Sequence, residues 1–129
     1  MQDVFIAIID DDEEDVELLN QFFKKISSIS IHDFSTGEQF LADTSKENLP
    51  CLLIVDLNLP DIRGMDLIKQ IKSNPMFSSV PIIVFTTSFS RTEQKTCEEL
   101  QIKLLKKPDT GLAWEEVALM MARNCNHIL

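Results

Sequence analysis

Glycine, proline and cysteine are scarce in this sequence, and tyrosine is absent. Its 129 residues include 3 glycines, 5 prolines and 3 cysteines. So little glycine and proline leaves no flexible linker to divide the chain, and no internal repeat is present. Cys51, Cys97 and Cys125 are far apart and form no CxxC pair, and Cys51 opens an apolar run. We therefore expect Cys51 to be a small buried hydrophobic residue in a reducing compartment.

Basic residues are outnumbered by acidic ones. Lysine and arginine total 12 against 21 aspartates and glutamates, a formal net charge of −9. A negative field repels nucleic acid and anionic membranes, so neither is expected as a partner. No apolar run approaches the roughly 18 residues of a membrane span, and residues 1–3 lack the basic stretch of a secretory leader. These absences predict a cytoplasmic protein.

Short apolar runs alternate with segments of helical periodicity. The strongest runs are residues 4–9, 51–55 and 82–85, with weaker ones at 29–34 and 102–105. Apolar positions at helical spacing include Val16, Leu19, Phe23 and Ile26, then Leu67, Ile68 and Ile71, then Leu112, Val117, Met120 and Met121, with weaker segments at 36–42 and 91–100. Strands alternating with helices indicate right-handed crossovers and a parallel sheet. We expect one α/β domain over residues 1–129, a flavodoxin-like (βα)5 doubly wound fold with strand order 2-1-3-4-5.

Acidic residues follow the first predicted strand. Residues 10–15 are six consecutive acids. Some of them complement the positive end of the next helix, and one serves as its cap. Asp10 and Asp11 are poorly explained in this way, because they lie at the strand end, where like charges repel. Clustered carboxylates in a partly dry site usually hold a cation.

Other polar residues follow the third, fourth and fifth strands. Asp56 ends the third strand, either as a turn residue or as part of the acidic site. In the proposed strand order it converges with Asp10 and Asp11, since neighbouring strands lie about 4.8 Å apart. Thr86 and Lys107 follow the next two strands and offer a hydroxyl and an ammonium group. Three carboxylates suit Mg²⁺, and the donors suit phosphoryl oxygens around a nucleophilic Asp56.

Four segments of the sequence closely resemble the receiver (response-regulator) domain of two-component phosphorelay signalling. They are IAIIDDDEED (6–15), LLIVDLNLPDIRGMDLI (52–68), VPIIVFTTS (80–88) and LLKKP (104–108). Together they span essentially the whole chain. The sequence around the third and fourth strands is most similar to that of single-domain receivers that pair with phytochrome-type or other hybrid histidine kinases.

The resemblance implies a role for each matching residue. Asp56 would accept a phosphoryl group from a phosphohistidine of a sensor histidine kinase or phosphotransfer protein. Mg²⁺ would be bound by Asp11, Asp56 and the backbone carbonyl of Asn58, with Asp10 helping through water. The remaining assignments are Thr86 as the switch hydroxyl, Lys107 as the phosphate-pairing lysine, and a cis peptide between Lys107 and Pro108.

Two features depart from the receiver pattern. Leu104 stands three residues before the lysine, where receivers usually carry tyrosine or phenylalanine, so the aromatic half of the switch is missing. Leu100, Gln101 and Ile102 replace the usual Gly-Ala before the fifth strand. Neither change touches the phosphorylation chemistry.

Three rival interpretations use the same fold. A haloacid-dehalogenase-type phosphatase needs a second acid two residues after its nucleophile, where this chain has Asn58. A flavodoxin-like FMN carrier needs a phosphate loop after the first strand, where six acids would repel the phosphate. A pseudo-receiver would lack part of the site. We therefore expect a phosphoacceptor module rather than an enzyme, without an output domain, that signals by docking to a downstream protein or by onward relay, as a monomer or weak dimer.

Overall fold

A five-stranded parallel sheet forms the centre of the protein. The structure is a computed structural model that describes residues 4–125. The strand order is β2-β1-β3-β4-β5, as the sequence predicts. The strands are β1 (Phe5–Ile9), β2 (Ser30–Phe34), β3 (Leu52–Val55), β4 (Ile82–Thr86) and β5 (Lys103–Lys106). Each predicted strand is present to within one residue at either end.

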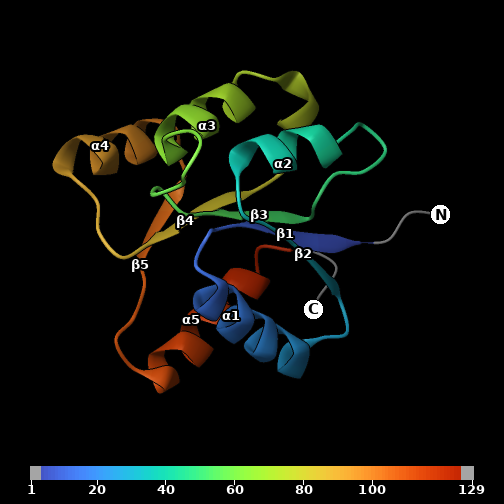
Figure 1. The fold of residues 1–129 in the computed structure, drawn as a ribbon, viewed down its shortest axis with the longest axis vertical. Helices are drawn as coiled ribbons and strands as arrows, with labels where there is room; N and C mark the ends of the chain where they lie inside the picture. Colours follow the sequence, from blue (N-terminus) through green and yellow to red (C-terminus); the bar gives the residue numbers. More distant parts are fainter. Residues whose placement is uncertain (1–3, 126–129) are drawn as a thin grey trace.

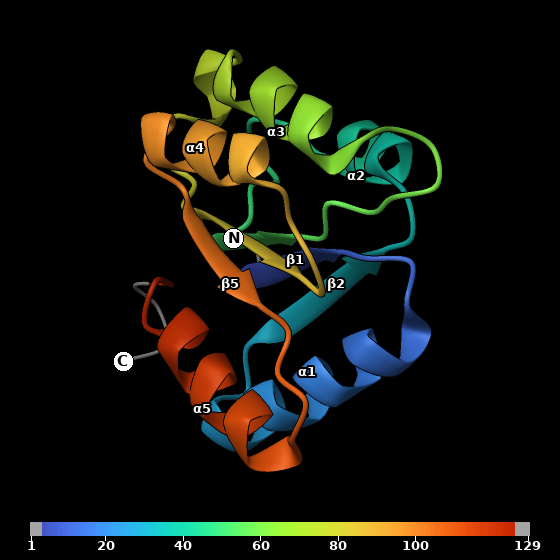
Figure 2. The same ribbon diagram turned by 90° about the vertical axis from the view of Figure 1, so that its left-hand side faces the viewer.

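Helices cover both faces of the sheet (Figures 1 and 2). On one face lie α2 (Gly37–Asp43), α3 (Gly64–Lys72) and α4 (Arg91–Glu99), and on the other lie α1 (Glu13–Ile26) and α5 (Gly111–Ala122); a short 3-10 turn, Pro75–Phe77, follows α3. None of the helices within the described range is long and apolar enough to cross a membrane.

Alternate residues of the central strands pack into two separate hydrophobic cores, one on each face of the sheet. In β1, Ile6 and Ile8 join the core beneath α1 and α5, whereas Phe5, Ala7 and Ile9 join the core beneath α2, α3 and α4. All residues of β1, β3 and β4 are buried, while both edge strands are partly exposed. The central strands therefore have continuous apolar runs in the sequence, whereas the partly exposed edge strands have weaker ones.

One expectation about the core is corrected. Met121 is buried but Met120, expected in the core, is 40% exposed, because α5 is apolar around most of its circumference and only one side meets the sheet. Trp114 packs edge-on against Phe85, as a core residue. The first three residues, on which the expected lack of a leader depended, and most of 124–129 lie outside the described range.

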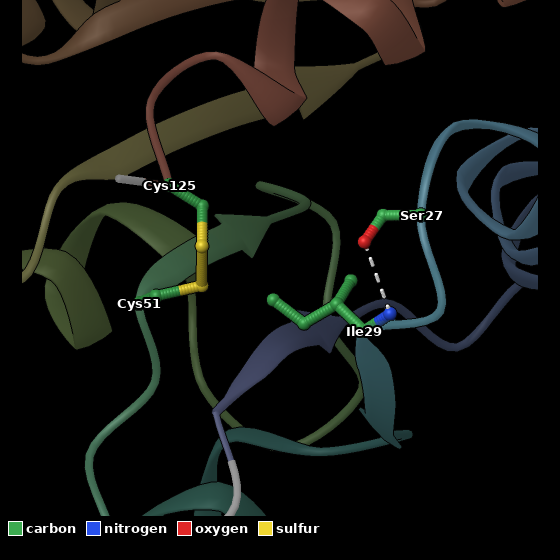
Figure 3. Close-up of a disulfide and its surroundings, with 4 residues drawn as sticks. All are labelled: Ser27, Ile29, Cys51 and Cys125. Carbon is green, nitrogen blue, oxygen red and sulfur yellow. Dashed lines mark hydrogen bonds between the residues drawn. A yellow bond between two sulfur atoms is a disulfide. The ribbon is translucent and has the colours of Figure 1, made fainter. Parts of the chain in front are cut away.

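The prediction that Cys51 is a small buried hydrophobic residue is wrong, because Cys51 is half-buried and disulfide-bonded. Cys51 and Cys125 form a disulfide across 74 residues of sequence, with their Cα atoms 5.1 Å apart, while Cys97 is free and buried. Figure 3 shows this bond beside Ser27 and Ile29 of the α1–β2 connection. The sheet order brings the start of β3 next to the residues after α5, and sequence spacing alone carries no sign of that proximity.

The end of α4 explains the departure from the receiver pattern before β5. The N–H of Ile102 donates to the Cys97 carbonyl at 2.8 Å, and the N–H of Gln101 donates to the Glu98 carbonyl at 3.1 Å. These two bonds form a Schellman motif, which requires a left-handed residue after the helix. Gln101 takes that conformation, with φ of 58°, at a position where glycine is usual.

Candidate functional site

A lysine lies among three carboxylates at the carboxyl edge of the sheet. The Lys107 Nζ donates to Asp10 Oδ2 at 2.8 Å, to Asp15 Oδ2 at 2.8 Å and to Asp56 Oδ2 at 3.1 Å. The side chains of Lys107 and Asp10 are each 4% exposed, and that of Asp56 is 8% exposed. The structure thus brings together Asp10, Asp56 and Lys107, as predicted, and adds Asp15.

Strand pairing is what makes these residues converge. Asp10 directly follows β1, and its N–H donates to the Phe34 carbonyl of the neighbouring strand at 3.0 Å. The N–H of Asp56 donates to the Ile9 carbonyl at 2.9 Å, so β3 and β1 end at the same level. Lys107 continues β5, and its N–H donates to the Thr86 carbonyl at 2.8 Å. Parallel strands place all their carboxyl ends on one edge, so local sequence fixes the site once the strand order is set.

Burial and charge shift the pKa values of this cluster in physically consistent directions. Burial raises the pKa of Asp10 to about 6, against the opposing effect of the hydrogen bonds from Lys107 and from the Asp12 N–H. The neighbouring carboxylates raise the pKa of Lys107 well above its usual value, although burial alone would lower it. Near neutral pH Asp10 and Lys107 are therefore both charged, and each stabilises the charge of the other.

Asn58 links the carboxylate of Asp56 to the hydroxyl of Thr86. Asp56 Oδ1 accepts from the N–H of Asn58 at 3.2 Å, and the Asn58 side-chain amide donates to Thr86 Oγ1 at 3.5 Å. The Thr86 hydroxyl is fully buried and donates to the Ser88 carbonyl at 3.3 Å. The predicted hydroxyl is therefore part of the same polar network as Asp56.

The loop after Asp56 is held by a glycine and by an aspartate. A Cβ built on Gly64 would lie 2.6 Å from the Asp56 carbonyl oxygen and 2.5 Å from the Leu57 Cα, so only glycine allows α3 to begin this close. Asp61 caps α2 across the chain: its two carboxylate oxygens accept from the N–H groups of Gly37 at 3.1 Å and Glu38 at 3.0 Å. Burial alone would raise the pKa of Asp61, but the backbone hydrogen bonds together outweigh it and hold the pKa below its usual value.

The carboxylates fit a divalent cation in chemistry, but they contact the ammonium instead in this structure. Among residues 4–125, no three acidic, histidine or cysteine side chains are grouped as a metal site. Asp11, predicted to be partly enclosed, is exposed in the short connection between β1 and α1. Asp10 and Asp56 nevertheless already converge on one positive charge, and hard oxygen donors of this kind suit Mg²⁺.

The predicted cis peptide before Pro108 is wrong. No peptide bond in the described part of the chain is cis. Lys107 reaches Asp56 through a trans bond, since its backbone continues the pairing with β4 and its side chain then spans the gap. Trans is the lower-energy isomer even before proline. Trp114 supports the same segment, because its indole Nε1 donates to the Pro108 carbonyl at 2.9 Å.

Sequence reasoning missed one feature of this region, the contact of Asp15 with Lys107. Asp15 was assigned only to the electrostatics of the α1 start, yet it contacts Lys107 as closely as Asp10 does. Its place in the first turn of a helix that begins beside the site was the available signal. Leu104 is partly buried in β5, opposite Val84, and packs with the core beneath α2, α3 and α4.

Comparison with known proteins agrees with this geometry. The profile of the response regulator receiver domain family matches residues 6–110. Response regulator Rcp1 of Synechocystis is 29% identical over 104 residues, covering 75% of this chain and 71% of Rcp1. Response regulator protein TodT of Pseudomonas putida is 33% identical over 78 residues, covering 60% of this chain but only 33% of TodT.

Solved structures share the whole fold. The phosphorylated cyanobacterial phytochrome response regulator RcpA superposes with a TM-score of 0.83 at 18% identity, covering 99% of this chain and 97% of RcpA. The Mn²⁺-bound form of Rcp1 superposes with a TM-score of 0.75 at 25% identity, covering 89% of this chain and 88% of Rcp1. The match of the family profile over most of the chain, on this fold, shows that the protein belongs to the response regulator receiver domain family of two-component signalling.

Proposed function

We propose that this receiver domain accepts a phosphoryl group on Asp56 from the phosphohistidine of a sensor histidine kinase or phosphotransfer protein. The observation that carries the proposal is the ion pair between Lys107 and the buried carboxylates of Asp10 and Asp56. Asp56 is the central acid of the group, since β3 lies between β1 and β4 in the sheet. The acids at residues 10–15 all follow β1, which lies to one side of β3 in the sheet.

The chemistry is an exchange of one bond to phosphorus for another. An oxygen of the Asp56 carboxylate attacks the phosphorus in line, the new P–O bond forms, and the P–N bond to the donor imidazole breaks. The imidazole leaves with the electron pair of that bond and is protonated. The product is an acyl phosphate, a known role for aspartate in proteins.

The side chains around Asp56 position the phosphoryl group and neutralise its charge. The Lys107 ammonium, 3.1 Å from Asp56 Oδ2, would pair with a phosphoryl oxygen. The Thr86 hydroxyl would exchange its bond to the Ser88 carbonyl for a bond to another phosphoryl oxygen. Asp10, Asp11, Asp56 and the backbone carbonyl of Asn58 would hold Mg²⁺, which supplies electrostatic stabilisation of the transferring group.

Asn58 argues for a phosphoacceptor rather than an enzyme. It stands two residues after Asp56, where a phosphatase of the aspartate-nucleophile class needs a general acid. An asparagine amide does not gain or lose a proton near neutral pH, so it cannot act as a general acid. Here its nitrogen donates a hydrogen bond to the hydroxyl oxygen of Thr86. The phosphoryl group would therefore persist on Asp56 long enough to be read by another protein.

Readout would follow from the movement of Thr86. Its displacement would repack the surface of α4, β5 and α5, where Leu104 replaces the usual aromatic residue. A leucine offers neither the same rotamer change nor a hydroxyl, so we expect a small rearrangement near residues 86–90. We propose a single cytoplasmic receiver domain over residues 1–129, a monomer or weak dimer, that docks to a downstream protein or relays the phosphoryl group onward.

The test is phosphorylation of the purified chain with acetyl phosphate and Mg²⁺. Intact-mass analysis should show the gain of one alkali-labile phosphoryl group. Asp56→Asn should abolish this gain. Asp12→Asn is the matched control, because asparagine also caps helices and the same charge is removed from an exposed neighbour. Full modification of the Asp56→Asn variant would contradict the assignment.

A further inference from the structure

Asp15 gives Lys107 a third carboxylate partner, from a different element than the other two. The Nζ–Oδ2 distance of 2.8 Å equals that to Asp10 and is shorter than the 3.1 Å to Asp56. The Asp15 side chain is 22% exposed, so the contact lies at the edge of the buried cluster. An ion pair this enclosed has a stronger effect on its partners than an exposed one.

The start of α1 fixes Asp15 in this position. Asp12 is the N-cap, and its Oδ1 accepts from the N–H of Glu14 at 3.1 Å and of Asp15 at 3.2 Å. The N–H of Asp12 in turn donates to Asp10 Oδ1 at 3.0 Å. This chain of bonds ties the first turn of the helix to the strand end. Glu13 and Glu14 share that turn but are exposed, and neither forms an ion pair with Lys107.

The lysine and a divalent cation need the same carboxylates. Under the proposed function, Asp10 and Asp56 contribute to the cation site, and both contact Lys107 here. Two positive charges cannot share these oxygens without strong repulsion. A buried ammonium that lost both partners would also be left without compensation for its desolvation. Among the residues that the structure describes, Asp15 is the one ion-pair partner of Lys107 outside the proposed ligand set.

We propose that Asp15 is a positioning residue that retains the Lys107 ammonium when a divalent cation binds Asp10 and Asp56. The lysine then stays within reach of Asp56, and the cation enters without leaving an unpaired buried charge. This inference rests on the proposed function, because it takes its ligand set from there. It assigns Asp15 a role toward the lysine rather than toward the cation.

The experiment is a double-mutant cycle on Mg²⁺ affinity, measured by calorimetry on the full chain without a phosphoryl donor. Asp15→Asn should weaken Mg²⁺ binding about tenfold, in the range of coupling found for contacting charged residues. Glu14→Gln is the matched control: it removes the same charge from the same turn without touching Lys107, and should weaken binding by less than about twofold. Asp15→Glu should restore most of the affinity.

The decisive comparison uses the Lys107→Gln background. There the effect of Asp15→Asn should shrink to that of Glu14→Gln, because the charge that Asp15 retains is gone. The Mg²⁺-induced shift in melting temperature gives the same comparison for any variant too unstable for calorimetry. An Asp15→Asn effect that is equal with and without the Lys107 charge would overturn the proposal, as would no effect at all.

These results separate this inference from the proposed function. A wild-type chain that is phosphorylated on Asp56 but binds no Mg²⁺ would overturn the role of Asp15 and keep Asp56 as the phosphoacceptor. The expected cycle in a chain that acetyl phosphate does not modify would overturn the phosphoacceptor function and keep the role of Asp15.

Discussion

The two ends of the sheet are held together by different forces. At the carboxyl end, Lys107 is bound only by hydrogen bonds and charge, to acids from β1, α1 and β3. At the amino end, a disulfide joins Cys51, just before β3, to Cys125, just after α5. One end is held by contacts that another cation can replace, and the other by a covalent bond that no ligand replaces.

This difference is consistent with the proposed function. Under that proposal the carboxyl end exchanges an ammonium for a metal ion and a phosphoryl group, so the contacts there have to be replaceable. The amino end lies about one strand length away and carries none of the proposed chemistry. We expect changes there to alter stability alone, and changes at the carboxyl end to alter stability and ligand binding together.

Reduction of the disulfide should give the largest effect on stability. In the chain-entropy account, releasing a closed loop of 74 residues costs up to about 4 kcal/mol in the free energy of unfolding. Urea denaturation with and without dithiothreitol measures this loss. Phosphorylation of the folded, reduced chain should be unchanged, because the bond lies at the opposite end from Asp56.

The double variant Cys51→Ser, Cys125→Ser is the control for reduction. It should match the reduced wild-type chain in stability, and dithiothreitol should have no further effect on it. If reduction impaired phosphorylation of the folded chain, the two ends would not be independent and the comparison would fail.

Lys107→Ala tests the electrostatic end. Without divalent cations it should lower stability by about 3 kcal/mol, because Asp10 and Asp56 lose the charge that compensates their burial. Millimolar Mg²⁺ should restore part of the loss, whereas it cannot restore the loss caused by reduction. Thermal unfolding with and without Mg²⁺ measures both effects.

Lys106→Ala removes the same side chain from the preceding position, where it is exposed. Its stability should stay within about 0.5 kcal/mol of the wild-type value, as for most surface substitutions. Equal destabilisation by the two lysine variants would show that the Lys107 contacts contribute nothing specific.

Asp61→Ala should have a smaller effect at the carboxyl end. Removing the carboxylate that caps α2 should cost about 1 kcal/mol at pH 7. Because the folded pKa of Asp61 lies below its ordinary value of 3.8, this contribution is present above that pH and is lost as the pH falls through the folded value. Asp61→Asn, which keeps one acceptor oxygen, should lose less, and denaturation at pH 7 and pH 3 measures the difference.

Gln101→Gly should give the smallest effect, and a stabilising one. A left-handed conformation strains a residue with a Cβ, whereas glycine adopts it freely but loses more entropy on folding. The net gain should be about 0.5 kcal/mol by urea denaturation. Gln101→Ala keeps the Cβ and should give no gain, so a similar gain for both would exclude relief of strain as the cause.

The sequence alone determined the sheet. The central strands are continuous apolar runs because both of their faces are covered, and this pattern depends on burial along one short segment. Asp10, Asp56, Thr86 and Lys107 were predicted together because each ends or directly follows a strand, so the strand order places them on one edge. The edge strands gave weaker signals, since each is only partly buried.

Tertiary structure decided which of these side chains make contact. The runs of acids and lysines contain several residues of equal charge, and only the path of α1 brings Asp15 to Lys107 while leaving Asp11 exposed. The same holds for Cys51 with Cys125 and for Asp61 with the start of α2. Such pairs join segments far apart in the chain, and their distances depend on helix packing that no local pattern of residues encodes.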